Sequence, residues 1–319
     1  MHKITKILFL VVFLTVLGAV RAQQAPVFTN YVNSYAVINP GYYGLSEGVN
    51  TMGIYRNQWT GFKDDVSGDV VSPRTFFVSA DLPIKILRGG VGLSLMKDQI
   101  GFEDNIAVNL GYSYHLDLGT GTLGIGMAFN FNNRSVDFSK AKPLDSNDPV
   151  IPTKEQNDML IDFNLGLFYT VPETFYVALS STSLLERKGK ALEGKSSTSA
   201  SFVGDRTFYL VAGYEYQFLN PKFVLNPSMM VLSDVASTQI NVSSRLWYNN
   251  KFWFGVNYRY QESVDLLVGF VFKGIQVSYA YDINTMKLKL PGSHEVSLSY
   301  CFKLDLERQP RIYRSIRYL

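Results

Sequence analysis

The sequence predicts an all-β protein that crosses an outer membrane as an antiparallel transmembrane β-barrel of about fourteen strands. Three observations lead to this prediction: an N-terminal export signal, long segments of alternating polarity, and aromatic residues at the ends of those segments. The composition agrees, because the 319 residues are 46% apolar and only 18% charged, against a typical charged share of about 25%. With 22 Phe and 20 Tyr the chain is too aromatic for a disordered protein.

Residues 1–22 have the pattern of a signal peptide. A basic start precedes an apolar run from Ile7 to Val20, which is shorter than the roughly 20 residues that cross a bilayer as a helix. Small residues then occupy the positions that a signal peptidase reads, so we expect cleavage between Ala22 and Gln23. An uncleaved membrane anchor is the alternative.

The rest of the chain alternates between apolar and polar residues with a period of two, which is the pattern of β-strands. In 206–218, one face carries Phe208, Leu210, Ala212, Tyr214, Tyr216 and Phe218, and the other carries Thr207, Gly213, Glu215 and Gln217. A water-soluble sandwich would alternate in the same way. The length of the segments favours a membrane barrel. They often exceed the roughly 5–6 residues of strands in soluble proteins and match the about 9–11 residues of tilted membrane strands. Aromatic residues in pairs, as at Tyr112–Tyr114, Tyr214–Tyr216 and Tyr258–Tyr260, are typical of the girdles at lipid headgroups.

We predict fourteen strands, an even number as in bacterial single-chain barrels. They lie near 48–58, 74–82, 88–97, 104–117, 121–132, 158–169, 174–182, 206–218, 222–232, 237–249, 251–260, 263–272, 274–282 and 293–303. If both termini are periplasmic, the long connections 59–73, 133–157, 183–205 and 283–292 all fall on the outer side, and short turns rich in Gly, Pro and Asn fall on the other. Two short connections, 233–236 and 261–262, also fall on the outer side.

The barrel would therefore comprise residues 48–304, with one segment on either side of it. Residues 23–47 are expected to be extended, and either to plug the lumen or to lie across its periplasmic mouth. A fourteen-stranded lumen is wider than the eight-stranded barrels that side chains fill completely, so this segment or folded loops could close it. The tail 305–319 carries Arg308, Arg311, Arg314 and Arg317. It is expected to dock periplasmically on an acidic partner, or else to lie solvated near anionic lipid.

Chemical motifs point to no catalytic, cofactor or metal site, so we expect neither an enzyme nor a cofactor. Gly119-Thr-Gly121-Thr-Leu-Gly124 matches a dinucleotide fingerprint in letters, but a strand pattern follows where the fingerprint needs a helix, which indicates a hairpin turn. The three His and the single Cys301 lack metal-ligand spacing. A net charge of +3 gives no sign of nucleic-acid binding. Six charged residues should face a solvated or ion-paired lumen: Asp162, Glu215, Arg245, Arg259, Asp282 and Glu295.

Four stretches resemble the PorP/SprF family of outer-membrane proteins, which are associated with type IX secretion and gliding in Bacteroidetes. They are Gln24–Phe28 with Ile38–Gly44, Tyr55–Phe62 with Pro73-Arg74-Thr75, Gly90–Leu95 with Asp98–Gly101, and Gly292–Leu298. The Arg-Asn-Gln-Trp order within the second stretch is the most specific of these. The landmarks span nearly the whole mature chain.

The resemblance implies a cell-outer-membrane protein that binds the C-terminal secretion domain of a cognate secreted adhesin or surface protein. Such a protein would support export or surface anchoring, and would contact periplasmic or outer-membrane components of the machinery as well as lipid. Arg56, Asn57, Gln58 and Trp59 are then candidates for contacting cargo or pinning a loop. The alternative is that Trp59 anchors the membrane interface and Arg56 forms a structural pair. The architecture alone equally suits a passive transport pore for a small nutrient or lipid.

Overall fold

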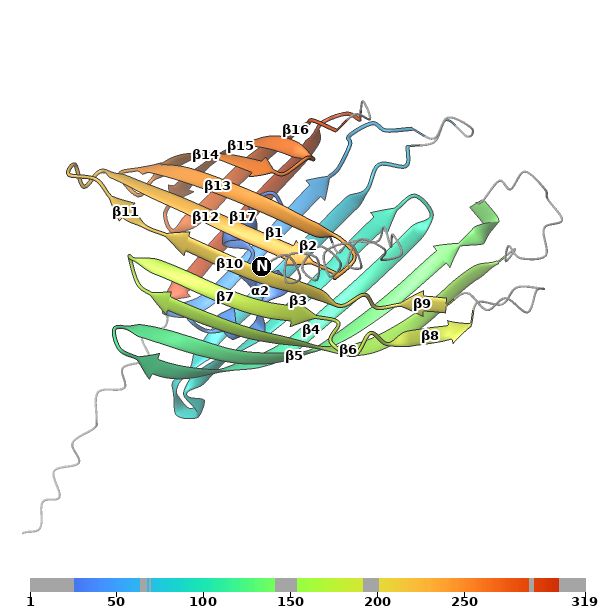
Figure 1. Cartoon of the computed structure of the whole chain (residues 1–319), viewed down its shortest axis with the longest axis horizontal. Coiled ribbons are helices and arrows are strands. Elements are labelled where there is room, and N and C mark those ends of the chain that lie inside the picture. The colour runs from blue at the N-terminus through green and yellow to red at the C-terminus, as the bar shows by residue number, and fades with distance from the viewer. Residues whose placement is uncertain are drawn as a thin grey trace, which may run out of the picture.

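The computed structural model describes residues 26–63, 68, 70–140, 154–191, 201–286 and 290–303. It is an antiparallel β-barrel (Figure 1) in which each strand pairs with its neighbours in the chain, β1 pairs with β17, and β10 pairs with β12 to complete the circle. The barrel strands are β1 (Gly48–Asn57), β2 (Arg74–Ile84), β3 (Gly89–Ile100), β4 (Glu103–Leu118), β5 (Gly121–Asp137), β6 (Glu155–Val171), β7 (Phe175–Thr182), β10 (Thr207–Tyr214) with its continuation β11 (Tyr216–Gln217), β12 (Phe223–Ser233), β13 (Thr238–Tyr248), β14 (Phe252–Arg259), β15 (Ser263–Phe272), β16 (Ile275–Asn284) and β17 (Ser293–Lys303).

Because β10 and β11 are two parts of one strand, the barrel has fourteen strands, as the sequence predicts. Each predicted range overlaps one of them. None of the described helices is long and apolar enough to span a membrane.

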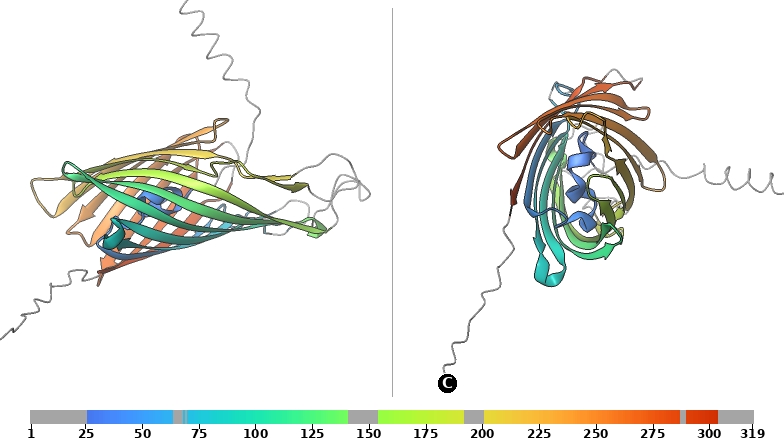
Figure 2. Two further views of the ribbon diagram at one scale, coloured as in Figure 1. Left: turned by 90° about the horizontal axis from the view of Figure 1, so that it is seen from below. Right: turned by 90° about the vertical axis from the view of Figure 1, so that its left-hand side faces the viewer.

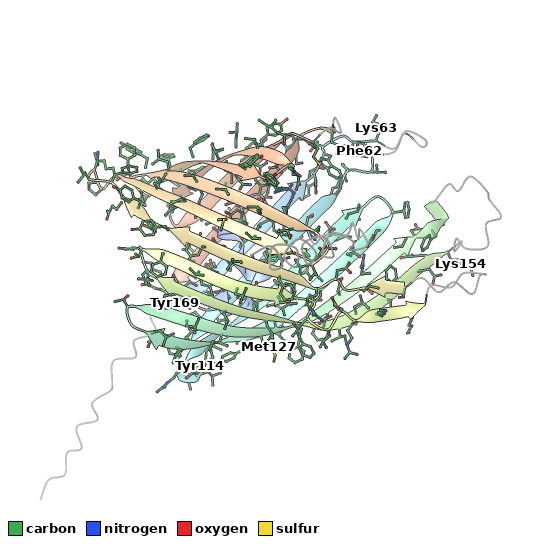
Figure 3. The ribbon with its side chains drawn as sticks, in the orientation of Figure 1. Phe62, Lys63, Tyr114, Met127, Lys154 and Tyr169 are labelled. Atoms are coloured by element: carbon green, nitrogen blue, oxygen red, sulfur yellow. The ribbon has the colours of Figure 1, made fainter. Side chains whose placement is uncertain are left out.

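The alternation of the sequence places apolar side chains outside and polar ones inside. Outward residues such as Leu110 and Met127 are about half exposed, whereas the inward Ser113 and Ala128 beside them are fully buried. Figure 3 shows Tyr114, Met127 and Tyr169 on the outer surface of the barrel wall. An apolar outer face is what lipid requires, since a Lys or Arg there costs about 2–4 kcal/mol at the bilayer midplane.

The two ends of the barrel differ in their connections. Every connection at the turn end is short, including the one that forms the short helix η4 (Lys85–Leu87), and the start of β1 and the end of β17 lie there too. The loop end carries the connections after β1, β5, β7 and β16 that are predicted to be long.

The wall of the barrel is uneven at its loop end. β5 and β6 each have 17 residues, whereas β7 and β14 have 8. The predicted loop 133–157 is too long at both ends. Residues 133–137 continue β5 up to the short helix η5 (Phe138–Lys140), and residues 155–157 belong to β6. The predicted loop 183–205 contains a hairpin of β8 (Lys188–Ala191) and β9 (Ser201–Val203). Figures 1 and 2 show β5, β6 and this hairpin extending past the rest of the barrel.

Residues 26–47, here called the lumenal segment, lie inside the barrel (Figure 2, right). The expectation of an extended segment was wrong, since it contains η2 (Tyr31–Asn33), α2 (Tyr35–Ile38) and η3 (Pro40–Tyr42). The physical reason is hydrogen bonding. The barrel strands pair with one another, so the backbone of the segment pairs locally, as from the Ser34 amide to the Tyr31 carbonyl at 3.0 Å.

Candidate functional site

Aromatic residues of the lumenal segment fill the middle of the barrel. Tyr31 and Tyr35 pack against Phe168 of β6, Val211 of β10 and Met230 of β12. Burial raises the pKa of the Tyr35 phenol well above its ordinary value, so its hydroxyl stays protonated and donates to the Tyr176 hydroxyl at 2.6 Å. On the other side of the lumen, Phe28 packs against Phe77 with ring centroids 5.8 Å apart. The segment thus spans the lumen and contacts opposite walls.

A buried charge network fixes the start of the lumenal segment. The guanidinium of Arg56 on β1 pairs with Asp282 at 2.7 Å and with Glu295 at 3.1 Å. Arg56 and Glu295 face each other in the β1–β17 register, so the strand pairing itself brings the two charges together. All three side chains are at most 5% exposed.

The carboxylates of this network also accept hydrogen bonds from the segment. Glu295 accepts the backbone amides of Thr29 at 2.7 Å and Asn30 at 2.9 Å. Asp282 accepts the Thr29 hydroxyl at 2.8 Å, and Arg56 donates to the same hydroxyl oxygen. A buried charge is costly unless it is paired and hydrogen-bonded, and the lumenal segment supplies part of that pairing. The network and the segment therefore depend on each other.

The remaining lumenal charges also have partners. Arg259 of β14 pairs with Glu262 at 2.8 Å, and Asn257 donates to Asp265 at 2.6 Å. Arg245 donates to Asn33 of the lumenal segment at 2.8 Å and lies over the Trp253 ring. Five of the six charged residues predicted to face the lumen are buried there: Asp162, Arg245, Arg259, Asp282 and Glu295. The sixth, Glu215, is half-buried between β10 and β11. Among the described residues, no cluster of three or more His, Cys, Asp or Glu is placed to hold a metal ion.

Inward-facing glycines let the backbone of the lumenal segment touch the wall. A Cβ atom on Gly124 would lie 2.0 Å from the carbonyl oxygen of Gly41. A Cβ on Gly126 would lie 2.2 Å from the Pro40 carbonyl carbon, and one on Gly166 would lie 2.0 Å from the Asn39 side-chain oxygen. Side chains at these positions would displace the segment.

Polar groups next to these glycines then hold the segment in place. Ser113 donates to the Gly41 carbonyl at 3.0 Å and the His115 ring nitrogen to the Tyr43 carbonyl at 2.9 Å. Asn39 donates to the Leu167 carbonyl at 3.0 Å. Gly119 lies in the predicted hairpin turn, with φ +62°. The prediction that Gly124 belongs to this turn was wrong, because Gly124 lies within β5 and faces the segment. The inward parity of Gly90, Gly92, Gly124, Gly126 and Gly166 was the signal that could have identified this contact.

A cavity of about 410 Å³ lies between the lumenal segment and the loop end. Its wall comes from β2 to β7 and β10, and Val37 and Ile38 of the segment contribute to its lining. Val203, which ends β9, and residues 204–205 also line it. The lumen is therefore filled towards the turn end and hollow towards the loop end.

The four candidates in the Arg-Asn-Gln-Trp motif lie in two different places. Arg56 is 2% exposed and turned into the lumen. The backbone amide of Gln58 donates to the Pro73 carbonyl at 2.9 Å, and that of Trp59 to the Ser293 hydroxyl at 3.1 Å. Asn57 ends β1 opposite His294. The last three residues thus join the first loop to the neighbouring strands at the loop end.

Two groups of candidate residues lie outside the described residues. These are the expected cleavage site at Ala22 and Gln23, and the tail arginines Arg308, Arg311, Arg314 and Arg317. Both remain predictions from the sequence.

The fold and the lumen together define an outer-membrane β-barrel that holds its own N-terminal segment inside. Residues 20–300 match the family described as type IX secretion system membrane protein PorP/SprF. The chain therefore belongs to this family, as the resemblance implied. No protein with a curated description is significantly similar to it in sequence.

Among solved structures, the chain is similar in fold to the toluene transporter TbuX of Ralstonia pickettii. The identity is 12% and the TM-score 0.52, with 85% of this chain and 94% of that chain covered. A FadL homologue of Pseudomonas aeruginosa is 10% identical with a TM-score of 0.47, covering 83% and 93% of the two chains. The first likeness supports the outer-membrane barrel fold.

Proposed function

We propose that this barrel binds the C-terminal secretion domain of a cognate secreted adhesin or surface protein and supports its export or its anchoring at the cell surface. Membership of the type IX secretion family supports a role in protein secretion. The observation that carries the finer proposal is the occupied lumen: residues 26–47 are held by buried charges and by close backbone contacts on both sides. A barrel built in this way suits a fixed base for a partner better than an open channel.

The loop end is the proposed docking surface. It combines the uneven wall of β5, β6 and the β8–β9 hairpin with the joined first and last loops. Arg134 of β5 ties the hairpin to the barrel by donating to the Val203 carbonyl at 2.9 Å and pairing with Glu103 at 2.6 Å. Because these loops are already held by hydrogen bonds, a partner domain that binds here would lose little free energy to ordering them.

The test is gentle detergent extraction of the tagged full-length protein from its own outer membrane, followed by mass spectrometry of what remains bound. We expect one large surface protein, retained through its C-terminal domain. A variant in which a short Gly-Ser linker replaces residues 188–203 should lose it. Leu219→Ser, on a fully exposed residue of the turn end, should retain it. Recovery of the barrel alone, together with ion conductance or a retained small ligand, would favour a transport pore instead.

The same proposal gives the Arg-rich tail a periplasmic role. Docking of residues 305–319 on an acidic component of the secretion machinery predicts that their deletion abolishes the periplasmic cross-links of the barrel. Unchanged cross-links would remove the tail from the proposal and leave the cargo-binding surface untouched.

A further inference from the structure

The loop-end cavity is lined by side-chain amides from three neighbouring strands. Asn105 and Asn109 lie on β4, Asn130 and Asn132 on β5, and Asn164 on β6. Asn109 and Asn130 are direct partners in the strand register, and the side chain of Asn130 donates to that of Asn109 at 2.7 Å. The side chain of Asn164 donates to the same oxygen at 3.0 Å. These bonds hold the amides in a fixed array.

Part of this array has unused hydrogen-bonding capacity. The side-chain oxygens of Asn105 and Asn132 and the Nε of Arg134 are buried and have no hydrogen-bond partner among the described residues. A buried polar atom without a partner costs about 1–3 kcal/mol. The cavity therefore presents two acceptors and one donor that a ligand could satisfy.

The charge of the cavity restricts the ligand. Asp98 and Glu103 line it, and the cation in its lining, Arg134, is already paired with Glu103. Asp98 also accepts the Thr75 hydroxyl at 2.6 Å. The resulting negative balance opposes an anion, including a peptide C-terminal carboxylate.

Apolar side chains complete the lining. Phe77 of β2, Met96 and Ile100 of β3 and Val37 of the lumenal segment also line it. Because β3 pairs with β4, these apolar groups adjoin the amides. A ligand that carries hydroxyls on an apolar ring would match both kinds of lining. The volume of about 410 Å³ lies within the roughly 300–1,000 Å³ of small-ligand pockets.

We propose that this cavity binds a neutral sugar of one or two rings. Each hydroxyl of a sugar both donates and accepts, as the two amide oxygens and the Arg134 Nε require. The C–H face of the ring would pack on Phe77 and Met96. This inference rests on the cavity alone and holds whether or not the barrel binds cargo.

The experiment uses the purified full-length protein in lauryldimethylamine oxide, a detergent without a sugar headgroup. The probes are glucose, galactose, mannose, N-acetylglucosamine and their disaccharides, detected by saturation-transfer-difference NMR with calorimetry of any that bind. We expect at least one to bind, and Asn132→Leu to weaken it by at least about tenfold, because it removes a buried polar partner. Asn133→Leu is the matched control, since Asn133 follows on the same strand with the opposite parity and should leave the affinity unchanged.

Three outcomes would overturn the proposal. The first is no signal from any of these sugars, and the second is equal weakening by the two substitutions. The third is a sugar that binds the wild type and Asn132→Leu with the same affinity, which would place its site elsewhere. Heat-modifiable migration on gels verifies that both variants are folded, so a loss of binding in Asn132→Leu alone reports on the cavity.

Discussion

Arg56 is the residue on which the buried charge network depends. Its guanidinium is the shared partner of Asp282, Glu295 and the Thr29 hydroxyl. Removing it would leave two carboxylates in a buried site without that partner. The cost of breaking a buried pair in this way is about 3–5 kcal/mol, much more than a surface pair contributes.

We therefore expect Arg56→Met to lower the free energy of unfolding of the detergent-solubilised barrel by about 3–5 kcal/mol. Urea unfolding followed by tryptophan fluorescence measures it. The control is Arg74→Met, because Arg74 also lies at the loop end, on β2, but is exposed; its effect should stay within about 0.5 kcal/mol. Equal effects of the two substitutions would contradict a special role for the network.

A second prediction at the residue scale concerns Gly126. Its substitution by Ala would place a Cβ 2.2 Å from the Pro40 carbonyl carbon, so the lumenal segment must move. We expect a raised ion conductance in planar bilayers, because displacement of the segment opens the lumen.

The matched control for Gly126→Ala is Gly53→Ala. Gly53 also lies in a barrel strand, but its added Cβ would lie 4.0 Å from the Phe77 carbonyl oxygen and the Val78 side chain. Its conductance should equal that of the wild type. A Gly126→Ala barrel with wild-type conductance would show that the close contact can relax without moving the segment.

At the scale of elements, Asp162 on β6 anchors the loop before the β8–β9 hairpin. Its carboxylate accepts the backbone amides of Leu185 at 2.8 Å and Arg187 at 3.3 Å. Strand β6 pairs with β7 only from Leu165 onwards. Before Leu165, the Asp162 carboxylate therefore binds the loop where a neighbouring strand would otherwise pair with β6. Asp162 thus holds the middle of the loop, while Asn164 accepts the Ser183 amide at its start at 3.0 Å.

We expect Asp162→Ala to speed hydrogen–deuterium exchange at the amides of 183–191 while exchange in the rest of the barrel stays unchanged. The substitution removes the acceptor and leaves the strand ladder in place. Asp104→Ala is the control, since Asp104 on β4 binds the side chains of Lys97 and Gln99, both at 3.1 Å, instead of backbone amides of this loop. Unchanged exchange at 183–191 would mean that the loop is held by other contacts, such as the Arg206 bond to the Leu184 carbonyl.

At the scale of the whole molecule, the barrel and the lumenal segment form one packed unit. The segment contributes Phe28, Tyr31 and Tyr35 to the two main apolar clusters, whose other buried members come from the strands. A fourteen-stranded barrel without it would have a wide lumen. The occupied lumen predicts a barrel that conducts poorly.

We expect the purified wild-type protein to show little conductance in planar bilayers, and a variant lacking residues 27–46 to show discrete, larger conductance steps. Heat-modifiable migration on gels verifies that the shortened variant still folds. Large steps from the wild type would contradict closure by the lumenal segment and would favour the transport pore.

The strands were predictable because their signal is local. Alternation with a period of two appears within each strand, as in 206–218. Lipid outside the barrel requires an apolar outer face on every strand, whichever strands lie next to it. Short turns of Gly, Pro and Asn then marked the turn end. The end of β5 and the start of β6 were missed because they lack an apolar alternation. Residues 133–137 and 155–157 are strands because they pair with each other, and Arg134 adds a bond to Glu103.

The sequence by itself determined the fold class, the number of strands and their inward and outward faces, because each depends on residues close together in the chain. Only the tertiary structure decided what fills the lumen. Arg56 meets Asp282 and Glu295 across more than 200 positions, and Gly41 meets Gly124 and Gly166 only after the barrel has closed around them. These contacts join segments far apart in the chain, and no local pattern records which partner a buried charge or an inward glycine will have.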